Sequence, residues 1–427
     1  MRYSFCNVLP ETHMTISRRS VVSIAVFVIL GVFVALGYWY ETQHVKPGQT
    51  TNSTAVNVTN GGDRGPGTLR EALFIAAAAD NEATISVQVP KITLETALPP
   101  LVNSHGIRLI AVETGAEIDA AALPGGPVLD VTGANASIEG LRIRNCKAAG
   151  ILLRAQHFRL QSTTIEMCDV GVEVAENASQ VLIEGNRFVN NRVGVRLTTS
   201  NRNTVVVKNE FSGHRDAAVW AVRGEPDPRG DAIGIRENHF TKERIGILAA
   251  NVSIAVERNE LVDSGEAAMQ LMGTGAVVRG NRVSGGAAMG IIAENSRGTV
   301  IENNEFDGLA AYGIMLKGSA DALLRGNRVH NSGYGLAFVV GTSPSTAIDN
   351  TIIEPRFTGI DVIGDSPVLR GNHVVRPKAL ALKVIDFQPD GAPKVRSQPF
   401  LEGNNFDAMG RIIAADNAAQ PVNTVRR

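Results

Sequence analysis

The sequence is poor in aromatic residues, which make up 5% of it, and it has three cysteines and a formal net charge of −1. A chain without an excess of basic residues lacks the electrostatic footprint of a nucleic-acid-binding protein, so we expect no nucleic-acid partner. It also lacks a nucleophile elbow, a P-loop and a dinucleotide-binding fingerprint. Its histidines show no metal-ligand spacing. We therefore expect neither a metal nor a cofactor.

The most informative feature that the sequence does have is a repeat. Asparagines recur at intervals of 21–23 residues, with one longer interval of 29 residues between Asn209 and Asn238. A repeat of this length is typical of a solenoid. The repeated asparagines are Asn186, Asn209, Asn238, Asn259, Asn281, Asn304, Asn327, Asn350 and Asn372.

Each asparagine lies in the same apolar–polar–apolar pattern, as Ile301 and Phe306 show around Asn304. Alternation at a step of two is typical of a strand with one buried face. A small residue and an apolar run follow eight or nine residues later, as in 313–316. Short strands without a helix between them predict an all-β parallel β-helix. A leucine-rich repeat has a similar period, but these coils lack its leucine spacing.

Equivalent residues of a parallel β-helix stack about 4.8 Å apart. We therefore expect the repeated asparagines to form a hydrogen-bonded asparagine ladder inside one turn of the solenoid. The other interpretation is that they are ordinary turn residues. Weaker coils without the asparagine, between 128 and 174, extend the pattern toward the N-terminus. The solenoid is accordingly predicted over residues 84–385.

The predicted solenoid needs a cover at each end, because an exposed end is an open sheet edge. Residues 67–78 predict a short amphipathic helix, with Thr68 and Glu71 as a capping box, within an N-terminal capping region at 61–83. Residues 386–427, with several prolines, predict an irregular C-terminal cover and tail.

The segment Gly65-Pro66-Gly67-Thr68-Leu69-Arg70-Glu71-Ala72-Leu73 resembles the G-P-G-T/S-L-R-x-A segment that opens many pectate-lyase-like proteins. The Gly-Asn and Gly-Ile dipeptides that recur in the later coils also resemble that superfamily. The resemblance implies a right-handed parallel β-helix. It is specific for the fold and weak for activity, because the superfamily contains lyases, hydrolases, epimerases and proteins that are not enzymes.

Residues 21–40 form an uncharged stretch long enough to span a membrane as a helix. Arg18 and Arg19 precede it, and Trp39 and Tyr40 lie at its far end as an interfacial belt. We expect a cytoplasmic head at 1–20, a single inner-membrane anchor at 21–40, a linker at 41–60 and a periplasmic or extracellular solenoid. The alternative is an exported protein cleaved near Ala35-Leu36-Gly37. Met14 is a second possible start of translation.

Two of the cysteines, Cys146 and Cys168, are one coil apart, which is within reach of a disulfide. Export would permit the bond. Their phases in the repeat differ by about one residue, however, so we expect two buried thiols and keep a disulfide as the alternative.

The strand that carries the Gly-Ile pair in each coil has a series of outward positions, called here the outward row. The row contains two widely separated carboxylates and much apolar surface, which does not suit the six to eight oxygen ligands of Ca²⁺. Its residues are Glu173, Arg196, Trp220, Leu248, Gln270, Ile292, Met315, Ala337, Asp361 and Lys383.

The one long coil is the best candidate for a functional site, because loops that leave a regular scaffold often carry function. Its extra residues are 223–231. The candidate catalytic residues are His214, Asp216, Arg223 and Arg229. The candidate substrate-binding residues are Arg215, Trp220, Asp227 and Asp231. The other interpretation of this segment is a solvated surface loop.

The resemblance implies an extracytoplasmic protein that binds or modifies a polysaccharide lying across successive coils. If the protein is an enzyme, we expect a uronate lyase or epimerase, since both reactions begin with abstraction of the C5 proton. A cation near the carboxylate would stabilise the resulting charge. The alternative is a non-catalytic scaffold or maturation factor, in which the apolar part of the outward row docks another cell-envelope protein.

Overall fold

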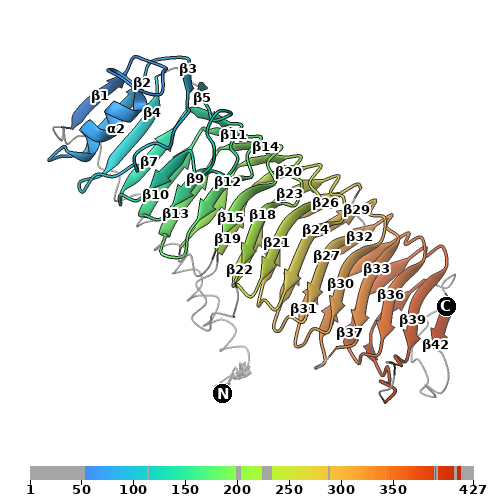
Figure 1. Ribbon diagram of the computed structural model, residues 1–427. Helices are drawn as coiled ribbons and strands as arrows, with labels where there is room; N and C mark the ends of the chain where they lie inside the picture. Colours follow the sequence, from blue (N-terminus) through green and yellow to red (C-terminus); the bar gives the residue numbers. More distant parts are fainter. Residues whose placement is uncertain are drawn as a thin grey trace, which may run out of the picture. The chain divides into compact units, whose positions relative to one another are not determined.

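The computed structural model describes residues 53–112, 115–198, 203–223, 233–286, 289–341, 343–388, 390, 393–407 and 411–414. These residues form one helix and three parallel sheets, whose short strands succeed one another coil by coil (Figure 1). The predicted parallel β-helix is therefore confirmed. No helix in this described part is long and apolar enough to cross a membrane. The predicted anchor at 21–40 lies outside the described residues.

Sheet A has 15 strands. They are β1 (Thr54–Val58), β2 (Ala83–Val87), β4 (Ile107–Ala111), β7 (Ala136–Glu139), β10 (Gln156–Gln161), β13 (Ser179–Glu184), β16 (Val205–Val207), β19 (Ile233–Arg236), β22 (Ile254–Glu257), β25 (Val277–Arg279), β28 (Val300–Glu302), β31 (Leu323–Arg325), β34 (Thr346–Ile348), β37 (Val368–Arg370) and β40 (Phe400–Glu402).

Sheet B has 14 strands. They are β3 (Lys91–Thr93), β5 (Ala116–Asp119), β8 (Leu141–Arg144), β11 (Thr164–Glu166), β14 (Arg187–Val189), β17 (Glu210–Ser212), β20 (His239–Thr241), β23 (Glu260–Val262), β26 (Arg282–Ser284), β29 (Glu305–Asp307), β32 (Arg328–His330), β35 (Thr351–Ile353), β38 (His373–Val375) and β41 (Asn405–Phe406).

Sheet C has 13 strands. They are β6 (Leu129–Val131), β9 (Ala149–Leu153), β12 (Val170–Val174), β15 (Val193–Leu197), β18 (Ala217–Val222), β21 (Ile245–Ala250), β24 (Ala267–Met272), β27 (Met289–Glu294), β30 (Tyr312–Lys317), β33 (Tyr334–Val339), β36 (Thr358–Ile363), β39 (Leu380–Ile385) and β42 (Arg411–Ala414).

The interior of the coils is filled by apolar side chains in register. The rings of Phe188, Phe211 and Phe240 stack with centroids 4.9 and 4.8 Å apart, because β14, β17 and β20 pair residue for residue. Offset or stacked ring pairs contribute about 0.5–1.5 kcal/mol each beyond the area that they bury. Stacking in register thus turns a sequence repeat into a continuous core.

The asparagine ladder is confirmed at the corner between sheets A and B. Within it, the backbone nitrogen and Nδ2 of Asn259 both donate to Oδ1 of Asn281, at 2.9 and 3.0 Å. Nδ2 of Asn281 donates in turn to Oδ1 of Asn304. The ladder also continues to Asn404, which accepts from Asn372 at 2.9 and 3.0 Å. Asn404 was not predicted as a member of the ladder, because this last coil is 32 residues long and breaks the repeat.

The residue before each predicted ladder asparagine has a positive φ, between 52° and 64°. This left-handed conformation turns the chain from sheet A into sheet B. Glycine adopts it without strain, as at Gly185 and Gly280, whereas Lys208 adopts it despite its side chain. The recurring Gly-Asn dipeptide of the sequence therefore marks the turn from sheet A into sheet B.

The helix α2 (Leu69–Ala77) forms where the capping box predicted it. Thr68 Oγ1 accepts from the backbone nitrogen of Glu71, and Leu69 and Leu73 are buried, while the helix packs against β1 and β2. β1 lies within the segment predicted as a linker, and β40 to β42 lie within the predicted C-terminal cover. The sheets therefore begin earlier and end later than expected.

Candidate functional site

The outer face of sheet C carries the outward row in the predicted order. The register pairs Glu173 with Arg196, Arg196 with Trp220 and Trp220 with Leu248. It continues to Asp361 and Lys383. The predicted parity of these strands is therefore confirmed. In Figure 1 the strands of this sheet lie in the front of the view, from β9 to β42.

A cation and an indole meet at the N-terminal part of this face. The guanidinium carbon of Arg196 lies 5.9 Å from the centroid of the Trp220 ring, and Nη1 of Arg196 is 3.8 Å from Oε1 of Glu173. All three side chains are partly exposed. A cation over an indole face is attractive by about 0.5–1 kcal/mol at such a site. The guanidinium of Arg196 therefore lies over the indole and close to the carboxylate of Glu173.

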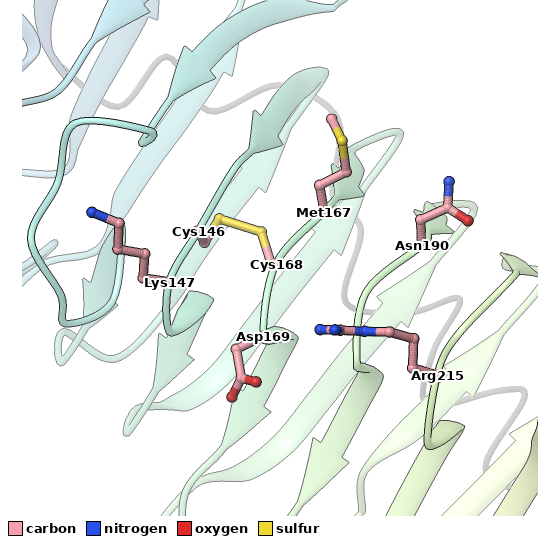
Figure 2. Close-up of a pocket in the computed structure, with 7 residues that line it drawn as sticks. All are labelled: Cys146, Lys147, Met167, Cys168, Asp169, Asn190 and Arg215. Atoms are coloured by element: carbon pink, nitrogen blue, oxygen red, sulfur yellow. A yellow bond between two sulfur atoms is a disulfide. The ribbon is translucent and has the colours of Figure 1, made fainter.

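A cavity of about 430 Å³ opens at the neighbouring corner, between sheets B and C (Figure 2). We call it the corner cavity. Its lining residues come from four successive coils, and they are Cys146, Lys147, Met167, Cys168, Asp169, Asn190 and Arg215.

The carboxylate of this cavity is already neutralised. Arg192 contacts Asp169 through Nε and Nη2 at 2.6 and 3.0 Å, and its Nη1 contacts Asp216 at 2.7 Å. The hydrogen bonds from Arg192 hold the pKa of Asp169 below its usual range, against the effect of burial. Asp169 is thus ionised at neutral pH, and its carboxylate is paired with Arg192.

The two remaining charged residues of the corner cavity are cations. Lys147 and Arg215 are exposed, and within the described ranges neither forms an ion pair within 4.0 Å. Because Asp169 is balanced by Arg192, the cavity carries a local excess of positive charge. Asn190 adds an amide that can donate or accept a hydrogen bond. This combination suits an anionic group such as a carboxylate.

The structure brings only some of the predicted site residues together. Arg215 lines the corner cavity, Trp220 lies on the face of β18, and Arg223 directly follows that strand. Asp216 is held by Arg192. Three further candidates, Asp227, Arg229 and Asp231, lie outside the described residues.

His214 lies in the core, so the structure does not offer it as a base to a ligand on the surface. Its side chain and that of Glu243 are both 0% exposed. Nδ1 of His214 is 2.9 Å from Oε2 of Glu243, and its Nε2 is 3.3 Å from Nδ2 of Asn191. Both ring nitrogens therefore face protein groups, because the side chain points inward at the corner.

His214 belongs to a second ladder that the sequence did not predict. This second ladder consists of Cys146, Cys168, Asn191, His214 and Glu243, one from each successive coil. The backbone nitrogen of Cys168 donates to Oδ1 of Asn191, and that of His214 donates to Oε2 of Glu243, at 2.9 and 2.8 Å. These five residues occupy the same position in successive coils, but they are of different types, so a search for one repeated residue does not find them.

Cys146 and Cys168 form a disulfide (Figure 2). The expectation of two thiols is therefore wrong. β8 and β11 pair Arg144 with Glu166, a separation of 22 residues, and the same separation carries Cys146 onto Cys168. Their phases are thus equal, not one residue apart as the sequence suggested.

The C-terminal part of the face carries aromatic rings over an acid. The rings of Tyr312 and Tyr334 stack at 4.4 Å, and the hydroxyl of Tyr312 donates to Oδ2 of Asp361 at 3.0 Å. Burial raises the pKa of Asp361 despite the opposing hydrogen bond from Tyr312 and the charge of Lys383. The sequence placed Asp361 in the outward row but gave no sign of this cover.

The model of the family described as "Right handed beta helix region" matches residues 102–228 and 227–375, which is more than half of the chain. The chain belongs to the right-handed β-helix family. The resemblance stated for the sequence is thereby confirmed at the level of the fold.

Solved right-handed β-helices resemble this one along most of its length. The catalytic unit of an α-1,3-glucanase from Streptomyces thermodiastaticus strain HF3-3 matches with a TM-score of 0.57 and 12% identity, covering 84% of this chain and 70% of that one. The receptor-binding domain of the siphovirus 9NA tailspike matches with a TM-score of 0.54 and 9% identity, covering 87% and 78%. At such identities these matches establish the fold alone. No curated protein matches the sequence.

Proposed function

We propose that this β-helix protein binds an acidic polysaccharide across successive coils at the N-terminal part of sheet C. The observation that carries the proposal is the corner cavity, where Lys147 and Arg215 have no acidic partner among the described residues. The carboxylate of a uronate residue would pair with these cations, and charge-assisted hydrogen bonds of this kind contribute about 1.5–3 kcal/mol.

The neighbouring strands supply a surface for the sugar ring itself. Trp220 on β18 brings a partly exposed indole to this face, and Arg196 on β15 brings a guanidinium beside it that can donate to sugar hydroxyls. Successive coils are about 4.8 Å apart, so a chain that crosses them meets new side chains at each coil. The site thus combines stacking at the sheet face with charge pairing at the corner.

Binding is better supported than catalysis in the described part of the site. His214 is buried against Glu243, and Asp216 is held by Arg192 at 2.7 Å. The catalytic candidates that remain for a uronate lyase or epimerase reaction, begun by abstraction of the C5 proton, are Arg223 and Arg229. That reaction stays a prediction.

The proposal is tested by isothermal titration of the full-length protein with oligo-uronates and with neutral glucans. Lys147→Ala with Arg215→Ala should weaken uronate binding at least about tenfold, because about 1.4 kcal/mol is lost with the paired charges. Arg244→Ala is the matched control, since Arg244 is an exposed cation paired with Glu266 outside the cavity. Equal loss in the control, or no loss in the double variant, would refute the proposal.

The same samples address the reaction. Ultraviolet absorbance detects the unsaturated ends that a lyase leaves, and proton NMR detects inversion at C5. Either signal, lost on Arg223→Ala, would assign the reaction to the segment after β18. Binding without either signal would establish a carbohydrate-binding protein.

The second candidate function is a scaffold that docks another cell-envelope protein. It is favoured by the apolar middle of the outward row, where Leu248, Ile292 and Met315 are partly exposed within four successive coils, with Gln270 between the first two. Capture of a defined envelope partner that is lost on Ile292→Asp, together with no saccharide binding, would replace the first proposal by this one.

We also propose that residues 21–40 anchor the chain in the inner membrane, with the β-helix on the extracytoplasmic side. The proposal rests on the uncharged stretch, the preceding Arg18 and Arg19, and the following Trp39 and Tyr40. Carbonate washing of membranes tests it. An anchored chain stays in the pellet, whereas a chain cleaved near Ala35 is released.

A further inference from the structure

Three aromatic rings line up on the outer face of the last coils of sheet C. Tyr334 stacks on Tyr312 at 4.4 Å with an interplanar angle of 18°, and its other neighbour, Phe357, lies 5.1 Å away at 33°. Phe357 is 51% exposed. The register pairs Tyr312 with Tyr334 and Tyr334 with Thr358, so the stack runs along the axis of the solenoid.

Asp361 faces outward beneath this stack. It lies between Ala337 and Lys383 in the outward row, yet it is only 2% exposed. The hydroxyl of Tyr312 reaches its Oδ2 from two coils away, at 3.0 Å. The small side chain of Ala337, in the coil between, leaves room for this contact. Tyr312 is therefore the cover of an otherwise outward acid.

One oxygen of the acid has no partner. Oδ1 of Asp361 is buried, and no described residue forms a hydrogen bond with it. An unpaired buried polar group costs about 1–3 kcal/mol, and more when it is charged. The core does not require this residue, because the side chain points away from it. The packing of the core therefore does not explain why an unpaired oxygen is buried here. A ligand that pairs with this oxygen would explain it.

We propose that Asp361, Tyr334 and Phe357 form a subsite for an uncharged pyranose ring, and that Tyr312 occupies this subsite in the free protein. The inference rests on the proposed function, in which a polysaccharide crosses sheet C. Tyr312 presents a ring on the face of Tyr334 and a hydroxyl to Asp361. A sugar that displaces Tyr312 offers the same two features and further hydroxyls for Oδ1.

The charges around the subsite favour an uncharged ring. Asp361 and Lys383 are the ionisable groups of the outward row on β36 and β39, and the residues of that row on β30 and β33 are Met315 and Ala337, which carry no charge. One acid and one base leave no excess of positive charge that would pair with a uronate carboxylate. Neutral sugar hydroxyls need no such excess.

The subsite lies far from the corner cavity along the same face. Six strand spacings separate Trp220 on β18 from Asp361 on β36, which corresponds to about 29 Å at 4.8 Å per coil. One extended oligosaccharide that reaches both positions would carry an acidic residue at one end and neutral residues at the other. The two sites are therefore separable by mutation.

The test uses variants with effects of opposite sign. Tyr312→Ala should raise the affinity for a neutral oligosaccharide about tenfold. The substitution removes the side chain that competes with the sugar for the face of Tyr334, and one stacking contact is worth about this factor. Tyr334→Ala and Asp361→Ala should lower the affinity by a similar factor. The probes are gluco-, manno- and galacto-oligosaccharides, titrated calorimetrically into the full-length protein.

Control variants show whether a change in oligosaccharide affinity arises at this subsite. Phe400→Ala removes an exposed ring on sheet A and should leave the affinity unchanged. Tyr334→Leu replaces Tyr334→Ala if the latter fails to fold. Lower affinity in Tyr312→Ala, or no neutral probe bound by any variant, overturns the proposal. Oligo-uronate binding through Lys147 and Arg215 is measured in parallel, so that failure of the proposed function is distinguished from failure of this subsite.

Discussion

Nδ1 of His214 lies 2.9 Å from Oε2 of Glu243, and neither side chain is exposed to solvent. The pair spans the long coil that contains residues 223–231, since the two residues are 29 positions apart. It also ties the coil to the second ladder, because the backbone nitrogen of His214 donates to the same carboxylate. We conclude that this histidine holds the corner together.

The first prediction follows from that burial. Glu243→Ala should lower the free energy of unfolding by about 3–5 kcal/mol, because it leaves a buried partner without its counterpart. His214→Ala should destabilise the protein in the same way. Urea unfolding followed by circular dichroism measures both changes.

His239→Ala is the matched control for this prediction. His239 lies 3.1 Å from Glu260, but the two side chains are 48% and 54% exposed. An exposed pair of this kind contributes about 0–1 kcal/mol. If His214→Ala kept its stability and lost a saccharide reaction instead, a catalytic role for His214 would be restored.

The second prediction concerns the asparagine ladder. Asn281→Ala should destabilise more than Asn186→Ala, by about the 0.5–1.5 kcal/mol of one hydrogen bond. Oδ1 of Asn281 accepts from both nitrogens of Asn259, whereas Oδ1 of Asn186 accepts only from the backbone nitrogen of Thr163. Melting temperatures of the two variants measure the difference, and equal losses would contradict it.

The third prediction concerns the disulfide. Peptide mass spectrometry without reductant should recover Cys146 and Cys168 in one linked species. Closing a loop of this size in the unfolded chain is worth about 3 kcal/mol on the chain-entropy account. Reduction should therefore lower the melting temperature of the wild type and leave that of Cys168→Ser unchanged. Recovery of two free thiols would show that the sulfur atoms only stack.

The fourth prediction is a pH dependence. Burial raises the pKa of Asp361, so its neutral form is favoured in the folded chain. The stability from such a group is fully present below the unfolded pKa of about 3.9 and is lost as the pH rises through the folded pKa. Asp361→Asn stays neutral, so it should raise the melting temperature at neutral pH and change it little in acid.

Asp63→Asn gives the opposite sign and serves as the control. Although burial acts to raise it, hydrogen bonds from Thr96 and Arg70 lower the pKa of Asp63 to about 2. Its contribution is present above the unfolded pKa and is lost as the pH falls toward about 2. Asp63→Asn should therefore destabilise at neutral pH. The same direction for both variants would rule out burial as the cause at Asp361.

The repeat made most of the fold predictable. A ladder such as that of Asn281 keeps one residue type in one phase, and the outward row follows from strand alternation once that phase is known. The sequence could not reveal the second ladder, because Asn191, His214 and Glu243 share a position without sharing a residue type. The longer coil before Asn404 hid the last rung for a related reason.

The site was harder to predict than the fold, because its contacts cross coils. Tyr312 covers Asp361 across 49 residues, and nothing in the local sequence of either residue indicates the contact. The corner cavity likewise depends on Lys147, Asp169 and Arg215 meeting from three coils. Trp220 and Arg215 were found because they flank the one irregular coil. Their role as binding residues remains a proposal.

The central claim is that an acidic saccharide binds at the corner cavity and the adjoining face of sheet C. Amide hydrogen exchange of the full-length protein, with and without an oligo-uronate, tests it most directly. The account predicts slower exchange at residues 146–148, 167–170, 190–193 and 213–216, with no change along the outer face of sheet B. Protection on sheet B, or none at the corner cavity under saturating ligand, would contradict it.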